Sequence, residues 1–142
     1  KYVMAHPFIT EATLARSAAA AISKLEVVHT GPAGRFDLRA PLKASVRTKL
    51  TAAVEAPGVT KTRLLLGLNQ PVQVYLDDKL VHRAPGNPKA IVQPDMIAID
   101  VTLHKGVNEL RLELEEAADA VIYARFLDPD RKLRYPKENK EK

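Results

Sequence analysis

The histidines and serines supply the side chains used in metal sites and in nucleophilic catalysis, but their spacing supports neither kind of site. The sequence has no H-x-x-x-H or H-E-x-x-H spacing, the arrangement that places two metal ligands on one face of a helix. None of its serines lies in the Gly-x-Ser-x-Gly sequence of a strand-to-helix nucleophile turn. The sequence therefore predicts that the protein is not an enzyme, and it offers no catalytic residue.

Two adjacent aspartates, Asp77 and Asp78, follow an alternating apolar stretch. Adjacent aspartates in a loop can bind calcium, which takes about six to eight oxygen ligands. Asp95 and Asn87 would then supply further oxygens from the segment that follows. The preferred interpretation is a polar two-residue hairpin turn, and a calcium site at Asp77, Asp78 and Asp95 is the alternative. No other cofactor is expected.

A long polar loop is the segment that we expect to face a ligand. Residues 84–94 contain three prolines and match neither a helix nor a strand pattern. Loops held on a rigid scaffold commonly carry recognition. His82, Arg83, Asn87 and Lys89 offer donors for hydroxyl or carboxylate groups, and they are the predicted ligand-binding residues.

The elements that must position these side chains are short strands. Apolar and polar residues alternate with a period of two, the pattern of a strand that has one buried face. The candidate strands, separated by turn residues, are 46–54, 61–68, 72–76, 79–82, 96–103, 107–114 and 120–127. Because each has one polar face, they favour a mainly β fold, an antiparallel β-sandwich or jelly roll of about 7–8 strands, over a parallel sheet.

The inward positions of these strands define an expected core. Five apolar residues are assigned to it: Leu65, Val74, Ile99, Leu112 and Ile122. Tyr75 and Tyr123 lie at alternating strand positions, and we expect them in the core rather than on a sugar-binding surface. A register error of one residue would turn each of these side chains to the other face.

The N-terminal segment is predicted to be an α-helix. Residues 10–25 are rich in alanine, which has the highest helix propensity, and Thr10 can cap the first turn. Leu14, Ala18 and Leu25 belong to an apolar stripe with spacings of three and four. The sequence thus predicts a helical segment in residues 1–30, a β-sandwich domain in residues 31–133 and a charged, disordered tail in residues 134–142.

Composition and charge exclude several classes of protein. The 142 residues contain no cysteine, which rules out disulfides, thiolate metal sites and cysteine nucleophiles. The net charge of +5 comes from 22 basic residues interleaved with 17 acidic ones, so nucleic acid is not an expected partner. The longest uncharged run, 64–76, is shorter than the roughly 20 residues of a membrane span. The chain begins without Met, so we expect it to be a piece of a longer protein or a processed product.

A series of motifs runs in order from Lys61 to Leu133. The strand KTRLLLGLNQ ends in a polar turn, and YLDDK at 75–79 takes the place of an aromatic-x-Asn-Gly-Lys hairpin. An apolar strand beginning at Asp95, the turn KGVN at 105–108, the strand ELRLEL and the stretch IYARFLDPDRKL follow. This order resembles the galactose-binding-like (jelly-roll) β-sandwich, an accessory domain of large multidomain bacterial secreted proteins. Residues 10–25 resemble the end of a helical-repeat array that precedes such a sandwich.

The resemblance implies a non-catalytic binding or interaction module of a larger extracytoplasmic bacterial protein, periplasmic or secreted. Its implied partners are carbohydrate and the neighbouring domains of the parent protein, and calcium sites also occur in this fold family. The chain has no Trp, the residue on which sugar-binding members often stack their ligands, and Asp-Asp replaces Asn-Gly at the hairpin. A purely structural or assembly domain without a small ligand is therefore the alternative.

Overall fold

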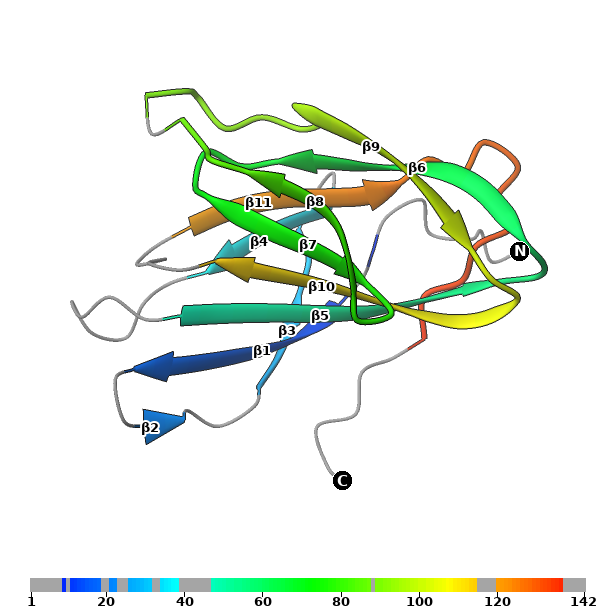
Figure 1. Ribbon diagram of the computed structural model, residues 1–142, viewed down its shortest axis with the longest axis horizontal. Coiled ribbons are helices and arrows are strands. Elements are labelled where there is room, and N and C mark those ends of the chain that lie inside the picture. The colour runs from blue at the N-terminus through cyan, green and yellow to red at the C-terminus, as the bar shows by residue number, and fades with distance from the viewer. Residues whose placement is uncertain are drawn as a thin grey trace.

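The computed structural model describes residues 9, 11–18, 21–22, 26–31, 34–38, 47–87, 89–114 and 120–136, which form two antiparallel sheets (Figure 1). The larger sheet contains β1 (Glu11–Ala18), β2 (Ala21–Ile22), β3 (Glu26–His29), β5 (Arg47–Ala56), β7 (Val72–Leu76), β8 (Lys79–Ala84) and β10 (Gly106–Leu114). The smaller sheet contains β4 (Arg35–Leu38), β6 (Thr60–Gly67), β9 (Ile97–Leu103) and β11 (Ala120–Phe126). The predicted antiparallel, mainly β architecture is confirmed. Among the residues just given, no helix is long and apolar enough to cross a membrane.

The order of the strands joins the two sheets into one sandwich. The larger sheet runs β2-β1-β5-β10-β7-β8, with β3 also paired to β1, and the smaller runs β4-β11-β6-β9. From β5 to β11 the chain crosses to the other sheet at every connection except the β7–β8 hairpin. Figure 1 shows the larger sheet from β2 at its lower edge to β8 at its upper edge.

Alternate residues of the two sheets point between them and form one apolar core. Four of the five predicted core residues are buried there: Val74, Ile99, Leu112 and Ile122. The assignment of Leu65 is wrong, because Leu64 and Leu66 on either side of it are fully buried and Leu65 is only half-buried. An uninterrupted run of leucines has no polar residue to mark the outward positions, so the period of two is ambiguous there.

The prediction that Tyr75 and Tyr123 lie in the core is also wrong, since both are half-buried. The neighbours of Tyr75 in β7, Val74 and Leu76, are buried, so strand alternation turns the Tyr75 ring to the outer face of the larger sheet. There the guanidinium of Arg111 lies 4.4 Å from the ring centroid. Tyr75 is therefore part of a surface rather than of the core.

The predicted N-terminal helix is corrected to strands wherever that segment is described. Residues 11–18 form β1 and residues 21–22 form β2, while the rest of 10–25 lies outside the described residues. Ala12 and Leu14 are buried with half-buried Thr13 between them, which is the period of a strand. β1 pairs with both β3 and β5, and the hydrogen bonds of this pairing outweigh the helix propensity of alanine.

The N-terminal strands belong to the sandwich. β1 and β3 share a sheet with β5, and the Thr30 hydroxyl donates a hydrogen bond to the carbonyl of buried Ile9. A strand at 11–18 removes the basis for likening this segment to the end of a helical-repeat array. The division into residues 1–30, 31–133 and 134–142 stays a prediction.

The β7–β8 hairpin has the two-residue turn that we predict from the sequence. Asp77 and Asp78 have φ values of 51° and 66°, and positive φ at both central residues is what a type I′ turn requires. Asp77 accepts a hydrogen bond of 2.9 Å from the Glu109 backbone N–H, and Arg111 donates to Asp78. The turn is thus tied to β10 as well as to its own strands.

Replacing Asp77-Asp78 with Asn-Gly is expected to change the free energy of unfolding by no more than about 1 kcal/mol. Asn and Gly adopt positive φ more readily than Asp, and the ion pair that is lost contributes little because its carboxylate, that of Asp78, is exposed to solvent. Thermal melts with calcium and with a chelator test the alternative interpretation. A calcium-dependent rise in Tm that disappears in the variant would show that these carboxylates hold an ion.

The described residues of the loop between β8 and β9, 85–87 and 89–96, are held against the sandwich near both ends of the loop. The Asn69 carbonyl accepts a hydrogen bond from the Asn87 N–H at 3.0 Å, and the Asn69 side chain donates to the Ala90 carbonyl at 3.1 Å. Further along, Arg125 of β11 donates two hydrogen bonds, 3.1 and 2.9 Å, to the carboxylate of Asp95. The loop is therefore anchored to the β6–β7 turn and to β11.

Acid is expected to weaken the second of these anchors. The hydrogen bond from Arg125 lowers the pKa of Asp95, so the folded state favours the carboxylate. The pair therefore stabilises the fold above the unfolded-state pKa of an aspartate, about 4, and this stability is lost as the pH falls through the lower folded-state pKa. Urea denaturation should show Asp95→Asn less stable than the wild type at neutral pH, with the difference vanishing in strong acid. A difference that is independent of pH would contradict this.

The chain leaves β11 along a C-terminal strap, residues 127–136. Leu133 of the strap is buried in the core, and Arg134 and Glu55 exchange backbone hydrogen bonds of 3.0 and 2.8 Å. Because Glu55 belongs to β5 of the larger sheet and the strap continues from β11 of the smaller one, the strap ties the two sheets together at this end.

The turn between β9 and β10, the KGVN motif, is organised by Asn108, which is fully buried. Its Oδ1 accepts the backbone N–H of His104 at 2.9 Å. Its amide nitrogen donates to the carbonyls of His104 and Gly106 at 3.0 and 3.2 Å. Gly106 has a φ of 100°, which favours glycine at this position of the motif.

Candidate functional site

A hollow opens on the outer face of the larger sheet, where β10, β7 and β8 lie side by side. Three polar side chains meet there in one row, because Glu113 of β10 is opposite Gln73 of β7, and Gln73 is opposite Arg83 of β8. The rest of the lining is proline and aliphatic: Pro71, Val72, Ala84 and Pro85. This Arg83 hollow has a volume of about 310 Å³, which fits a small ligand.

Hydrogen bonds hold two side chains of the polar row, Gln73 and Glu113. The Tyr75 hydroxyl donates to Gln73 Oε1 at 2.8 Å, and Arg111 Nε donates to Glu113 Oε2 at 2.8 Å. The hydrogen bond from Arg111 to Asp78 raises the pKa of Arg111, whose guanidinium lies over the Tyr75 ring. Side chains that are already ordered lose little conformational entropy when a ligand binds.

Of the four residues predicted to bind a ligand, Arg83 lines this hollow and the other three lie near it along the chain. His82 is half-buried on β8 opposite Val74, which belongs to the core. The side-chain oxygen of Asn87 accepts the backbone N–H of Lys89 at 3.1 Å, and Lys89 itself is exposed. The binding roles of His82, Asn87 and Lys89 stay predictions.

Sequence reasoning missed Gln73 and Glu113 as companions of Arg83. The sequence does place both at outward positions of alternating strands, so the signal that they are surface residues was available. That β10 lies beside β7 follows from the order of strands in the sheet, and a single sequence does not reveal that order.

The three candidate calcium ligands lie in two different places. Asp77 and Asp78 form the β7–β8 turn, whereas Asp95 lies before β9 and is paired with Arg125 of the smaller sheet. In the part of the chain that the structure describes, no three His, Cys, Asp or Glu side chains gather as metal ligands would. A calcium site at these residues stays a prediction, and the melting experiment above tests it.

No protein-family model matches the sequence, and no curated protein matches it. Solved structures do resemble the fold. A family 35 carbohydrate-binding module from an environmental isolate is 14% identical with a TM-score of 0.56, and the match covers 89% of this chain and 98% of that one. An anti-sigma factor domain-containing protein is 10% identical with a TM-score of 0.59, covering 89% of this chain and 45% of that one. The β-glucosidase of Kluyveromyces marxianus, in complex with glucose, is 16% identical with a TM-score of 0.55, and the match covers 92% of this chain and 16% of that one.

The similarity to these solved structures concerns the fold. The chain spans nearly the whole of the carbohydrate-binding module but less than half of each of the two longer chains. Identities this low show the fold alone. Together with the two antiparallel sheets, they show that the chain folds as an antiparallel β-sandwich. This fold is consistent with the resemblance to the galactose-binding-like β-sandwich that the order of the motifs indicates.

Proposed function

We propose that the protein is a non-catalytic carbohydrate-binding module of a larger extracytoplasmic bacterial protein, periplasmic or secreted. The carbohydrate-binding module among the similar structures supports the class of ligand. The other two similar structures contain such a sandwich within longer chains, which supports a larger parent protein with neighbouring domains as partners. The observation that carries the proposal is the row of Glu113, Gln73 and Arg83 in the Arg83 hollow.

The groups in the hollow can contact both the hydroxyl groups and the C–H groups of a sugar ring. Sugar hydroxyls donate to a carboxylate and accept from a guanidinium or an amide, and Glu113, Arg83 and Gln73 supply these groups. Because Oε1 of Gln73 holds the Tyr75 hydroxyl, the amide nitrogen is the end of Gln73 that remains for a ligand. The prolines offer apolar contacts to the C–H groups of the ring.

The same lining favours binding over cleavage. Among the residues that the structure describes, one carboxylate, that of Glu113, lines the hollow, and it accepts a hydrogen bond from Arg111. Hydrolysis of a glycosidic bond generally uses two acidic side chains, one on each side of the bond. The hollow therefore supports a role in holding a sugar rather than in hydrolysing it.

A glycan array with the purified protein, followed by titration calorimetry with the sugars that bind, tests the proposal. Arg83→Ala is expected to weaken binding about tenfold or more, because it removes charge-assisted hydrogen bonds. Lys105→Ala removes the same charge at the β9–β10 turn, outside the hollow, and should bind like the wild type.

Two results would change the proposal. A protein that binds nothing on the array would favour the alternative, a structural or assembly domain without a small ligand. Full affinity in Arg83→Ala together with loss in an Asn87→Ala/Lys89→Ala variant would move the site from the hollow to the β8–β9 loop.

A further inference from the structure

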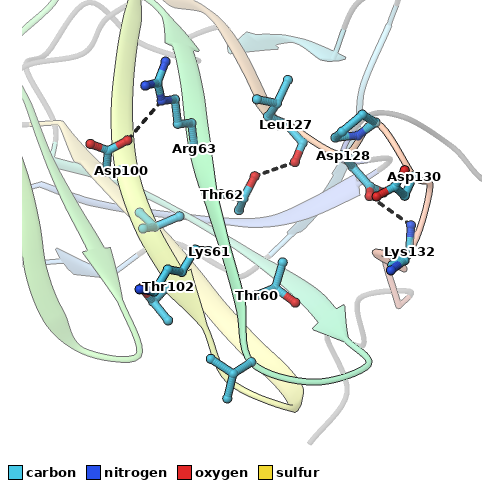
Figure 2. Close-up of a pocket in the computed structure, with 13 residues that line it drawn as sticks. Thr60, Lys61, Thr62, Arg63, Asp100, Thr102, Leu127, Asp128, Asp130 and Lys132 are labelled. Atoms are coloured by element: carbon cyan, nitrogen blue, oxygen red, sulfur yellow. Dashed lines mark hydrogen bonds and ion pairs between the residues drawn. The ribbon is translucent and has the colours of Figure 1, made fainter.

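A second and larger cleft lies on the other sheet, between the β6–β9 pair and the C-terminal strap (Figure 2). This β6–β9 cleft has a volume of about 770 Å³. It opens because β11 ends at Phe126, opposite Leu64, whereas β6 extends to Thr60 with β9 beside it. The strap turns away at Asp128, whose carboxylate accepts the backbone N–H groups of Lys132 and Leu133.

Internal contacts hold both walls of the cleft. Arg63 of β6 donates a hydrogen bond of 3.0 Å to Asp100 of β9, which fixes the wall formed by the sheet. The Thr62 hydroxyl donates to the Leu127 carbonyl, which fastens the start of the strap to β6. Figure 2 shows these two contacts on either side of β6, with Lys61 and Thr102 together on the sheet wall. The cleft is therefore a formed feature of the fold.

The charges that line the cleft are balanced. Of the described residues, three basic and three acidic side chains contribute: Lys61, Arg63, Lys132, Asp100, Asp128 and Asp130. Arg63 and Asp100 neutralise each other, and Asp128 is engaged by backbone N–H groups. Besides the Arg63–Asp100 pair, the described lining holds two basic and two acidic groups, Lys61, Lys132, Asp128 and Asp130. This balance of charge favours a neutral polar ligand over an anion or a cation.

We propose that the β6–β9 cleft is a second carbohydrate site, an inference that rests on the proposed function of the module. Lys61, Lys132 and Thr102 offer donors to sugar hydroxyls, and Asp130 offers an acceptor. Leu127, which is 40% exposed, provides an apolar surface for the ring. The cleft is more than twice the volume of the Arg83 hollow, so it has room for a longer stretch of a sugar chain.

The two sites lie on different sheets of the sandwich, so one short oligosaccharide does not reach both. The module therefore engages two sugar chains, or two separated places on one long polysaccharide. Two weak sites used together raise the overall affinity for an insoluble or polymeric ligand well above that of either site.

Titration calorimetry of the intact protein with xylotetraose, mannotetraose and cellotetraose tests the second site. With a tetrasaccharide that binds, the wild type is expected to bind two molecules per protein. The Lys61→Ala/Thr102→Ala variant is expected to bind one molecule, at the hollow, and Arg83→Ala one molecule, at the cleft. Lys61, Thr102 and Arg83 are exposed, so these variants should melt like the wild type, and Lys105→Ala should keep both sites.

The stoichiometries separate this inference from the proposed function. One molecule per protein, lost in Arg83→Ala and retained in Lys61→Ala/Thr102→Ala, would overturn the second site and leave the function standing. One molecule lost in Lys61→Ala/Thr102→Ala and retained in Arg83→Ala would support the cleft and overturn the assignment of the hollow. No binding of any tetrasaccharide by the wild type would overturn both.

Discussion

Leu112→Ala is expected to lower the free energy of unfolding by about 2–5 kcal/mol. Leu112 is 1% exposed and lies on β10 at the centre of the larger sheet. It is opposite Leu50 of β5 and Val74 of β7, both buried, so its side chain packs within the core rather than at its margin. Removing it leaves a cavity that these neighbours fill only in part, and urea denaturation measures the loss.

Leu65→Ala is the matched control, because it makes the same substitution at an outward position of β6. Leu65 is half-buried, so its truncation should cost about 1 kcal/mol or less. Equal losses in the two variants would mean that Leu65 packs in the core as the leucine run first indicates. A small loss of unfolding free energy in Leu112→Ala would mean that Leu112 points outward and that the residues on either side of it in β10 point into the core.

Asn108→Ala is expected to cost about 1–3 kcal/mol although it removes few atoms. The side chain satisfies the His104 N–H and the carbonyls of His104 and Gly106, and Asn108 is fully buried. Alanine leaves these backbone groups without that partner. Asn108→Asp should not restore the stability, because it sets a carboxylate against two carbonyl oxygens. Thermal and urea denaturation of both variants measure the effect.

Val107→Ala is the control for this turn, since Val107 is adjacent in β10 and 54% exposed. It should leave the stability within about 0.5 kcal/mol of the wild type. If Asn108→Ala proves no more harmful than Val107→Ala, the turn does not depend on the buried amide, and the role given to the KGVN motif is wrong.

The sequence pattern predicts correctly which strand residues are buried in the sandwich where polar residues mark the outward positions. Leu112, for example, lies between Arg111 and Glu113, and its burial is predicted correctly. Residues 11–18 are predicted wrongly because alanine fits a helical stripe as well as a strand, and only the partners β3 and β5 decide between them. Helix propensity is a local property, whereas pairing depends on segments far away in the sequence.

The candidate sites likewise depend on which strands pair, and the local sequence does not reveal that pairing. Arg83 is predicted as a ligand-binding residue from its position beside a proline-rich loop, and it does line a hollow. Gln73 and Glu113 reach that hollow only because β10 pairs with β7, and the β6–β9 cleft exists only because β11 stops at Phe126. Both facts belong to the arrangement of strands, so composition and motifs do not predict them.

The alternation of the chain between the two sheets also governs how quickly the protein can fold. From β5 to β11 the β7–β8 hairpin is the one pair of consecutive strands that are hydrogen-bonded to each other, while β10 must meet β5 across four intervening strands. Chain entropy is lost before such distant pairings form their hydrogen bonds. Refolding therefore belongs to the slow class of β proteins, roughly milliseconds to seconds, with strand edges exposed to other chains in the meantime.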